Sequence, residues 1–370
     1  MRLNSFRLLI SRKRKDRRPK LDKISPWEDI LSKSITSAED LPAQFDMNRG
    51  GLEPVIQRYP MRINPYYMGL IKQKNDPMYL QCVPTLEEIS MEQGHEDPLN
   101  EEESSPVPGL THRYPDRVLF LISSRCAMYC RFCNRKRKVG RTSMVTAKSI
   151  KEGVSYIKGH PEIRDVLLSG GDPLLLSDED LHFILAEIRA IEHVQIIRIG
   201  TRAPCTLPQR VTPELVALLG KFHPLYINTH FNHPDEITPE ASFACNLLAN
   251  GGVPLNCQTV LLKGVNDSPG TIKELMQKLL MIRVRPYYLF QADPARGTAH
   301  FWTPLEKGIE IMRALQGHTS GLCVPHFVVD LLGGGGKIPI FPEYVTQVDG
   351  DTIRARNYLG REYLHPVCER

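Results

Sequence analysis

Short apolar runs rich in β-branched residues recur along the chain from about residue 117, and longer amphipathic stretches separate them. Alternation of these two patterns is typical of repeated βα units, in which a helix follows each strand and packs on the sheet. We expect six such units, with a seventh strand candidate at 326–331. The six expected strands lie at 118–123, 165–169, 195–200, 225–230, 255–262 and 286–291.

The stretches between these runs begin with helix start signals. Ser177 precedes an apolar pattern with helical spacing. A threonine followed by a proline, which suits the first helical position, precedes three others, at Thr212, Thr238 and Thr303. Thr303 and Glu306 also fit a capping box. We therefore expect an α/β fold, an open or partial parallel barrel of the (β/α)6 type rather than a doubly wound sheet, with its active site at the carboxyl ends of the strands.

The regions that flank the barrel have a different pattern. Residues 1–107 lack regular alternation and are rich in proline and charge, so we expect an irregular N-terminal extension that is helical in part. The barrel is predicted to span 108–331. Residues 332–370 are predicted to form a short C-terminal extension that carries a lysine for a cofactor.

The composition is that of a globular protein, since 41% of the 370 residues are hydrophobic. The formal net charge is only +5, and the basic residues include one run at 12–18. A role in nucleic-acid binding would therefore rest mainly on that segment. No apolar run reaches the roughly 18 residues that span a bilayer, and no secretion signal is recognisable, so we expect a cytoplasmic protein. Nine cysteines, most of them scattered singly, fit a reducing compartment.

Three cysteines, Cys126, Cys130 and Cys133, are clustered in the loop "CAMYCRFC" directly after the first expected strand. A four-cysteine zinc site usually pairs two C-x2-C knuckles, and the chain has no second knuckle. Three ligands in one loop instead match a four-iron, four-sulfur cluster with one iron free of protein ligands. Nearby basic residues are expected to lower the pKa of the thiols and to offset the charge of the cluster. These are Arg125, Arg131, Arg135, Lys136 and Arg137.

Two glycine-rich stretches mark further candidate sites. In "SGGDP", at the end of the second strand, Gly171 allows the backbone to approach a ligand, and Asp172 can accept a hydrogen bond from a ligand ammonium. In "LLGGGGKIP", four glycines form a flexible backbone that carries Lys337. A phosphate-binding P-loop needs Ser or Thr after the lysine, and Ile338 occupies that position. Lys337 is therefore either an ordinary surface residue or a Schiff-base lysine for pyridoxal 5′-phosphate.

The cysteine spacing resembles that of the radical S-adenosylmethionine (SAM) superfamily, and the full motif set resembles its lysine 2,3-aminomutases. The likeness covers about three quarters of the chain and includes "INPYYMGLI", "SSPVPGLTHRYPDR", "NTHFNHPDEIT", "GVND", "GHTSG" and "GGGGK". It implies an isomerase that moves the α-amino group of L-lysine from C2 to C3 and gives β-lysine. It also implies three cofactors, a [4Fe-4S] cluster, S-adenosyl-L-methionine and pyridoxal 5′-phosphate.

The resemblance implies a role for individual residues. Those assigned to cofactors are Cys126, Cys130 and Cys133 for the cluster, Gly171, Asp172 and Gln258 for SAM, and Lys337 and Arg117 for the Schiff base and phosphate of pyridoxal phosphate. Arg135 is expected to pair with the substrate carboxylate, and Asp293 and Asp330 with its distal ammonium. Two carboxylates at strand ends suit a cation and disfavour a second carboxylate, and glutamate-specific relatives replace them.

The best-known lysine enzymes bind zinc between subunits through a C-terminal cysteine cluster and a cysteine after "GVND". Here Ser268 follows "GVND" and only Cys368 remains near the end of the sequence, so we predict no structural zinc. The expected partners are an amino-acid substrate and a reducing electron donor such as flavodoxin or ferredoxin, with a homo-oligomer left open and neither a membrane nor a nucleic acid. Alternatives are an arginine 2,3-aminomutase, an enzyme making the opposite β-lysine stereoisomer for modification of a translation factor, and, more distantly, a nucleic-acid-binding iron–sulfur protein.

Overall fold

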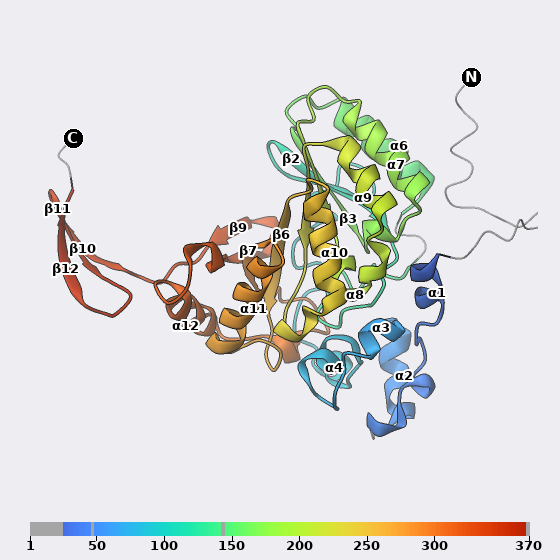
Figure 1. The fold of residues 1–370 in the computed structure, drawn as a ribbon, viewed down its shortest axis with the longest axis horizontal. Helices are drawn as coiled ribbons and strands as arrows, with labels where there is room; N and C mark the ends of the chain where they lie inside the picture. The colour runs from blue at the N-terminus through green and yellow to red at the C-terminus, as the bar shows by residue number, and fades with distance from the viewer. Residues whose placement is uncertain (1–24, 46–47, 142–144, 368–370) are drawn as a thin grey trace, which may run out of the picture.

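The computed structural model describes residues 25–45, 48–141 and 145–367. Its centre is a nine-stranded sheet whose strands β1 to β9 follow one another in sequence order (Figure 1). An antiparallel strand forms each edge, β1 (Leu110–Tyr114) and β9 (Gly336–Pro339). The parallel strands between them are β2 (Arg117–Ser123), β3 (Asp165–Gly170), β4 (Ile196–Gly200), β5 (Leu225–Thr229), β6 (Leu255–Leu261), β7 (Val284–Gln291) and β8 (His326–Leu331).

The sheet curves into a nearly closed barrel, and its two edge strands meet through a side chain. The hydroxyl of Tyr114 on β1 accepts a hydrogen bond from the backbone N–H of Lys337 on β9 at 2.9 Å. Along β3, the buried residues Val166 and Leu168 alternate with Asp165, Leu167 and Ser169, which line a cavity inside the barrel. This period of two gives the sheet an apolar outer face, on which the helices pack, and an inner face whose side chains line the cavity.

Helices connect the parallel strands and cover the outside of the barrel (Figure 1). They are α6 (Ala147–Lys158), α7 (Asp178–Arg189), α8 (Ala203–Thr206), α9 (Pro213–Leu219), α10 (Pro239–Asn250), α11 (Pro269–Met281) and α12 (Leu305–Leu315). The parallel barrel and all seven expected strands are confirmed. Among the described residues, no helix is long and apolar enough to cross a membrane.

Three of the four expected helix caps are N-caps whose hydroxyl oxygen accepts a backbone hydrogen bond, Ser177, Thr212 and Thr238. The fourth prediction, a capping box at Thr303, is wrong, because the N-cap of α12 is Pro304 and makes no side-chain bond. The side chain of Gln291 donates instead to the Thr303 carbonyl at 2.7 Å and to its hydroxyl at 3.3 Å. A contact with the end of β7 therefore occupies the hydroxyl that would have capped the helix.

The described part of the N-terminal extension is helical in part, as expected. Its helices are α1 (Pro26–Ser32), α2 (Arg49–Arg58), α3 (Pro65–Met68), α4 (Pro77–Cys82) and α5 (Glu87–Ser90). This extension holds the loop that follows β2. The backbone N–H groups of Tyr129 and Arg131 donate to the carbonyls of Arg62 and Gln81 at 3.0 and 2.9 Å. The basic run at 12–18 lies outside the described residues.

The C-terminal region contains a second sheet that the sequence patterns did not predict. Strands β10 (Val345–Asp349), β11 (Thr352–Arg356) and β12 (Glu362–Pro366) form an antiparallel sheet that projects away from the barrel (Figure 1). The division of the chain at 107 and 331 stays our proposal. We note that β9 continues the barrel sheet past residue 331.

Candidate active site inside the barrel

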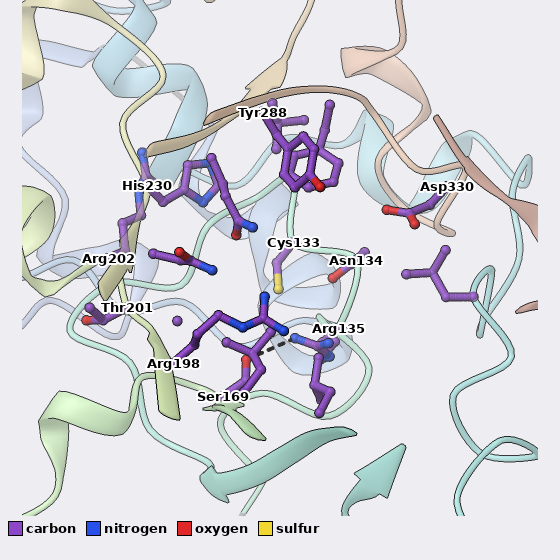
Figure 2. A pocket seen from close by; sticks show the side chains of 18 of the residues that line it. Cys133, Asn134, Arg135, Ser169, Arg198, Thr201, Arg202, His230, Tyr288 and Asp330 are labelled. Atoms are coloured by element: carbon purple, nitrogen blue, oxygen red, sulfur yellow. Dashed lines mark hydrogen bonds between the residues drawn. The ribbon is translucent and has the colours of Figure 1, made fainter. Parts of the chain in front are cut away.

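A cavity of about 1060 Å³ lies inside the barrel and is lined by side chains from the strands and from the loop after β2 (Figure 2). Every residue that the sequence singled out for a cofactor or substrate lies on its wall. These are Arg117, Cys126, Cys130, Cys133, Arg135, Gly171, Asp172, Gln258, Asp293, Asp330 and Lys337. The barrel therefore brings together residues that are more than two hundred positions apart in the chain.

The cysteine loop is anchored by a buried group of three charges. The fully buried carboxylate of Glu88, from α5, contacts Arg131 at 2.5 Å and Lys136 at 2.8 Å. Burial opposes ionisation of this carboxyl, but the two cations outweigh it and lower its pKa to about 2. Removing one partner of such a buried group leaves an uncompensated charge, so the group fixes the loop to the N-terminal extension.

Two further basic residues of the loop are paired with acidic ones, and a third contacts a backbone carbonyl. Arg135 contacts Glu101 at 2.6 Å, and Arg137 contacts Asp97 at 2.8 Å. The side chain of Arg125 donates to the carbonyl of Leu175 at 2.8 Å. The basic charge of this loop is thus largely neutralised by the acidic stretch that precedes β1.

The expected lowering of the thiol pKa values is wrong for two of the three cysteines, because burial outweighs the effect of the nearby cations. Burial, followed by the charge of Asp172, raises the pKa of Cys126 well above its usual value. Burial, followed by the neighbouring Cys130, raises the pKa of Cys133 to about 11. Burial therefore favours the protonated thiol at Cys126 and Cys133, and coordination to iron would make them thiolates.

The donor set of the loop fits an iron–sulfur cluster better than a single ion. Among the described residues, no three His, Cys, Asp or Glu side chains are arranged to hold one metal ion. The three thiols lie instead around the wall of one cavity, and a four-iron cluster spaces its thiolates more widely than a single ion does. The prediction that the protein has no structural zinc stays a prediction, and Cys368 lies outside the described residues.

The glycines of "SGGDP" allow two loops to pack backbone against backbone. Gly170 has a φ of 133°, and a Cβ on Gly171 would lie 2.4 Å from the carbonyl oxygen of Arg125. The N–H groups of Gly171 and Asp172 donate to the carbonyls of Ser123 and Arg125, each at 2.7 Å. The close approach that these glycines allow is thus an approach to the cysteine loop, which positions it over the end of β3.

The carboxylate of Asp172 already has three hydrogen-bond donors from the protein. Its Oδ1 accepts from Leu174 N at 3.0 Å and from Thr201 Oγ1 at 2.6 Å, and its Oδ2 accepts from Arg202 N at 2.9 Å. Asp172 therefore joins the ends of β3 and β4 in this structure. Its expected role as an acceptor for the SAM ammonium stays a prediction.

Lys337 lies on a strand that pairs with the barrel sheet, and the flexibility expected for the four glycines stays a prediction. Residues 336–339 form β9, in which Lys337 is the direct cross-strand partner of Asp330 on β8. Gly333 and Gly334, with φ of 65° and 83°, make the tight turn between the two strands. The Lys337 Nζ is 2.6 Å from Asp330 Oδ2 and 4.5 Å from the centre of the Phe290 ring.

Asp293 lies close enough to this pair for its titration to depend on both partners. Burial, then the negative charge of Asp330, raises the pKa of Asp293 to about 6. Asn134, between the last cysteine and Arg135, donates to Asp293 Oδ2 at 2.7 Å. The cavity wall therefore carries two carboxylates beside one lysine, which is an arrangement that suits a further cation.

The guanidinium of Arg135 is bound along one edge by a buried glutamate. Its Nε is 2.8 Å from Glu101 Oε1 and its Nη2 is 2.6 Å from the same oxygen, whereas Nη1 points to Ser169 Oγ at 3.4 Å (Figure 2). The planar fork of arginine has a second edge, on the Nη1 side, that this contact leaves for another acceptor. No sequence pattern indicated that Glu101 would be its partner.

Arg117 lies at the start of β2 rather than at the carboxyl ends of the strands. Its guanidinium stacks on the Tyr114 ring at 3.8 Å and contacts Asp116 at 2.9 Å. Gln258 lies on β6, within the same wall. Sequence reasoning missed His230 and Arg202, which also line the cavity. His230 is the last residue of the expected strand 225–230 and Arg202 lies two residues after the expected strand 195–200, and that position at a strand end was the available signal.

Known proteins resemble this chain over most of its length. A model of the radical SAM superfamily matches residues 120–279, and one described as lysine-2,3-aminomutase matches residues 312–366. The L-lysine 2,3-aminomutase of Clostridium subterminale is 50% identical over 350 residues, which cover 92% of this chain and 84% of that protein. The chain belongs to the lysine 2,3-aminomutase family of the radical SAM superfamily.

Other relatives describe the range of this family. The L-lysine 2,3-aminomutase of Methanococcus maripaludis is 51% identical, over 93% of this chain and 83% of that protein. A glutamate 2,3-aminomutase of Clostridioides difficile is 43% identical, over 90% of this chain and 80% of its own length. These relatives are thus named for amino acids whose side chains carry opposite charges.

Family membership makes this protein an isomerase with a [4Fe-4S] cluster, S-adenosylmethionine and pyridoxal 5′-phosphate as cofactors. The cavity has groups of the right chemistry for them. It offers three thiols in one loop, a lysine amine on a barrel strand, and basic and aromatic side chains at Arg117 and Tyr114. The assignment of each residue to its cofactor is our proposal.

Proposed function

We propose that the protein moves the α-amino group of L-lysine from C2 to C3 and so produces β-lysine. The observation that carries this choice is the pair Asp293 and Asp330, which face one cavity beside Lys337. Two carboxylates near each other favour a cationic group and repel a third carboxylate. The name of the relatives near 50% identity supports the same substrate.

The cofactors carry the bond-breaking chemistry, because the cluster with SAM supplies a hydrogen-abstracting radical and pyridoxal phosphate supplies a π system for the migrating nitrogen. The protein prepares the amine that would bind pyridoxal phosphate. Asp330 Oδ2 lies 2.6 Å from Lys337 Nζ, so it is placed to hold the ammonium and to accept its proton when the free amine is needed. Once that proton has passed on to solvent, Asp330 is again a carboxylate without a cation beside it and can receive another one.

We infer that the substrate is then held at both ends. Asp330 and Asp293 would receive the distal ammonium, and the outer edge of the Arg135 guanidinium would receive the carboxylate. Glu101 keeps Arg135 oriented by binding its other edge. Holding an amino acid at two points fixes the carbon that reacts and restricts side reactions.

An anaerobic assay of the reconstituted enzyme with lysine, arginine and glutamate, each supplied separately, tests the proposal. Lysine should give its β-isomer, and glutamate should give none.

Asp330→Asn should lower turnover of lysine by about two orders of magnitude or more, because an unpaired, partly buried cation costs about 3–5 kcal/mol and about 1.4 kcal/mol corresponds to tenfold. Asp349→Asn, on the exposed strand β10, is the matched control. Normal turnover of lysine by an Asp293→Asn/Asp330→Asn double variant would contradict this reading of the carboxylates.

A second candidate, arginine 2,3-aminomutation, needs the same cationic pocket, and the assay with arginine decides between them. The stereochemistry of the β-lysine, and with it the alternative of translation-factor modification, is decided by chiral analysis of the product.

Nucleic-acid binding rests on residues 12–18 and the paired charges of the cysteine loop, and steep salt dependence of RNA or DNA binding would be its sign. We further propose a cytoplasmic location, a flavodoxin- or ferredoxin-like electron donor, and a homo-oligomer as the assembly to test by light scattering.

The affinity for lysine should fall below about pH 6. The pKa of Asp293 lies at about 6, above its ordinary value of 3.8, so the ionised form that attracts an ammonium is lost as the pH falls through 6. KM for lysine should then rise by about tenfold per pH unit below that point. Burial lowers the pKa of the cavity histidine His230 to about 3, so it does not titrate in this range. Steady-state kinetics between pH 5 and pH 8 measure the effect, and an unchanged profile in Asp293→Asn would refute the assignment.

A further inference from the structure

Arg202 is a buried cation in contact with one of the three cysteines. It follows β4, and its side chain is 9% exposed. The Nη1 group lies 2.8 Å from Cys130 Sγ, at hydrogen-bond distance for a sulfur acceptor. Among the described residues, this is the one hydrogen bond from a charged side chain to a thiol of the cysteine loop that the structure records. Figure 2 shows Arg202 beside Thr201 and His230 on the cavity wall.

A polar network holds the other side of this guanidinium. Nη2 donates to Gln81 Oε1 at 2.6 Å and to the fully buried Glu236 Oε1 at 2.7 Å. The face of the guanidinium lies 5.2 Å from the centre of the Phe132 ring. Glu236 accepts further hydrogen bonds from Tyr67 at 2.7 Å and from the backbone of Asn232 at 2.6 Å. These contacts come from both the N-terminal extension and the barrel, so they fix the position of Arg202.

We propose that Arg202 is a positioning residue that raises the reduction potential of the iron–sulfur cluster through its hydrogen bond to Cys130, and that Glu236 moderates this effect. The proposal concerns electron uptake by the cluster and does not depend on which amino acid is the substrate. It uses two residues that none of the cofactor or substrate assignments above includes.

The direction of the effect follows from charge. Reduction adds one electron from an external low-potential donor and makes the cluster and its thiolates more negative, and no bond to Arg202 forms or breaks. A fixed cation that donates to a ligand sulfur stabilises the more negative state and therefore raises the potential. The carboxylate of Glu236, on the other side of the guanidinium, offsets part of that charge. Burial of both groups keeps water from screening them.

The test is a redox titration of the reconstituted cluster in the full-length holoenzyme. The reduced cluster is measured by electron paramagnetic resonance, and no amino-acid substrate is added. Arg202→Gln should shift the midpoint potential to a more negative value. Arg202→Lys, which keeps the charge and one donor, should recover part of the shift. Glu236→Gln should move the potential in the opposite direction, because it leaves the charge of Arg202 without its counterion. Iron content is measured for each variant so that loss of the cluster is recognised.

Arg125→Gln is the matched control, since Arg125 belongs to the same loop but its side chain donates to the carbonyl of Leu175. Its shift should be smaller than that of Arg202→Gln. If Arg202→Gln fails to hold iron, the other two variants test the proposal. The midpoint potential should then be lower than that of the wild type in Arg202→Lys and higher in Glu236→Gln. Wild-type potentials in those two iron-loaded variants would overturn the proposal. The proposed function would be unaffected by that result, because it is measured by product formation from lysine.

Discussion

Replacing any one of Cys126, Cys130 and Cys133 with alanine is expected to remove the cluster and abolish cleavage of S-adenosylmethionine. The reason is that one loop would supply every protein ligand of the cluster, so two thiols would have to hold what three hold in the wild type. Burial also favours the protonated form of the Cys126 and Cys133 thiols, and a thiol must lose its proton to bind iron. A loop with only two cysteines should therefore hold the cluster too weakly to keep it. Iron and sulfide analysis, with the visible spectrum of the reconstituted protein, measures the loss.

Two other buried cysteines serve as controls for these substitutions. Cys205 lies in α8 and Cys323 lies near the start of β8, and neither lines the cavity that the three loop cysteines share. Cys205→Ala and Cys323→Ala should keep the iron content close to that of the wild type. A triple Cys126→Ala/Cys130→Ala/Cys133→Ala variant that still binds a full complement of iron would disprove the assignment.

The barrel could be predicted from the sequence because its parallel strands are buried and rich in β-branched residues. All seven were located to within a few residues, since each is a short apolar run, and helix start signals follow four of them. The edge strands β1 and β9 were missed because they are short and contain polar or glycine residues. The three strands β10 to β12 are exposed along most of their length, so no apolar alternation marks them.

The candidate site was predictable where a residue lies at the end of a strand or in the loop after it, and unpredictable where it depends on a partner from another region. The three cysteines, Asp293 and Asp330 belong to the first kind, because the carboxyl ends of parallel strands converge at one end of a barrel. The pairing of Arg135 with Glu101 belongs to the second kind. It requires the acidic stretch before β1 to lie on the cysteine loop, and nothing in the spacing of charges along the chain encodes that contact.

Lys337→Ala is expected to eliminate turnover and covalent binding of pyridoxal phosphate while leaving the iron–sulfur spectrum intact. The two cofactors would be held by separate segments, β9 for the lysine and the loop after β2 for the cysteines. Absorbance of the bound pyridoxal phosphate should disappear, and borohydride reduction followed by peptide mapping should label Lys337 in the wild type alone. Lys307→Ala, on α12, removes a lysine that pairs with Glu310 at 2.7 Å and should change neither cofactor.

The same substitution also tests the charge arrangement beside the lysine. In this structure the ammonium of Lys337 lies 2.6 Å from Asp330, and the charge of Asp330 in turn raises the pKa of Asp293. Removing the ammonium leaves two carboxylates without that cation, so the pKa of Asp293 should rise further. Lys337→Met keeps most of the side-chain volume and should show the same loss of cofactor. That result would assign the loss to the missing amine and not to the space that alanine leaves. A pyridoxyl label on another lysine of the wild type, or catalysis by Lys337→Met at the wild-type rate, would show that Lys337 is not the cofactor lysine.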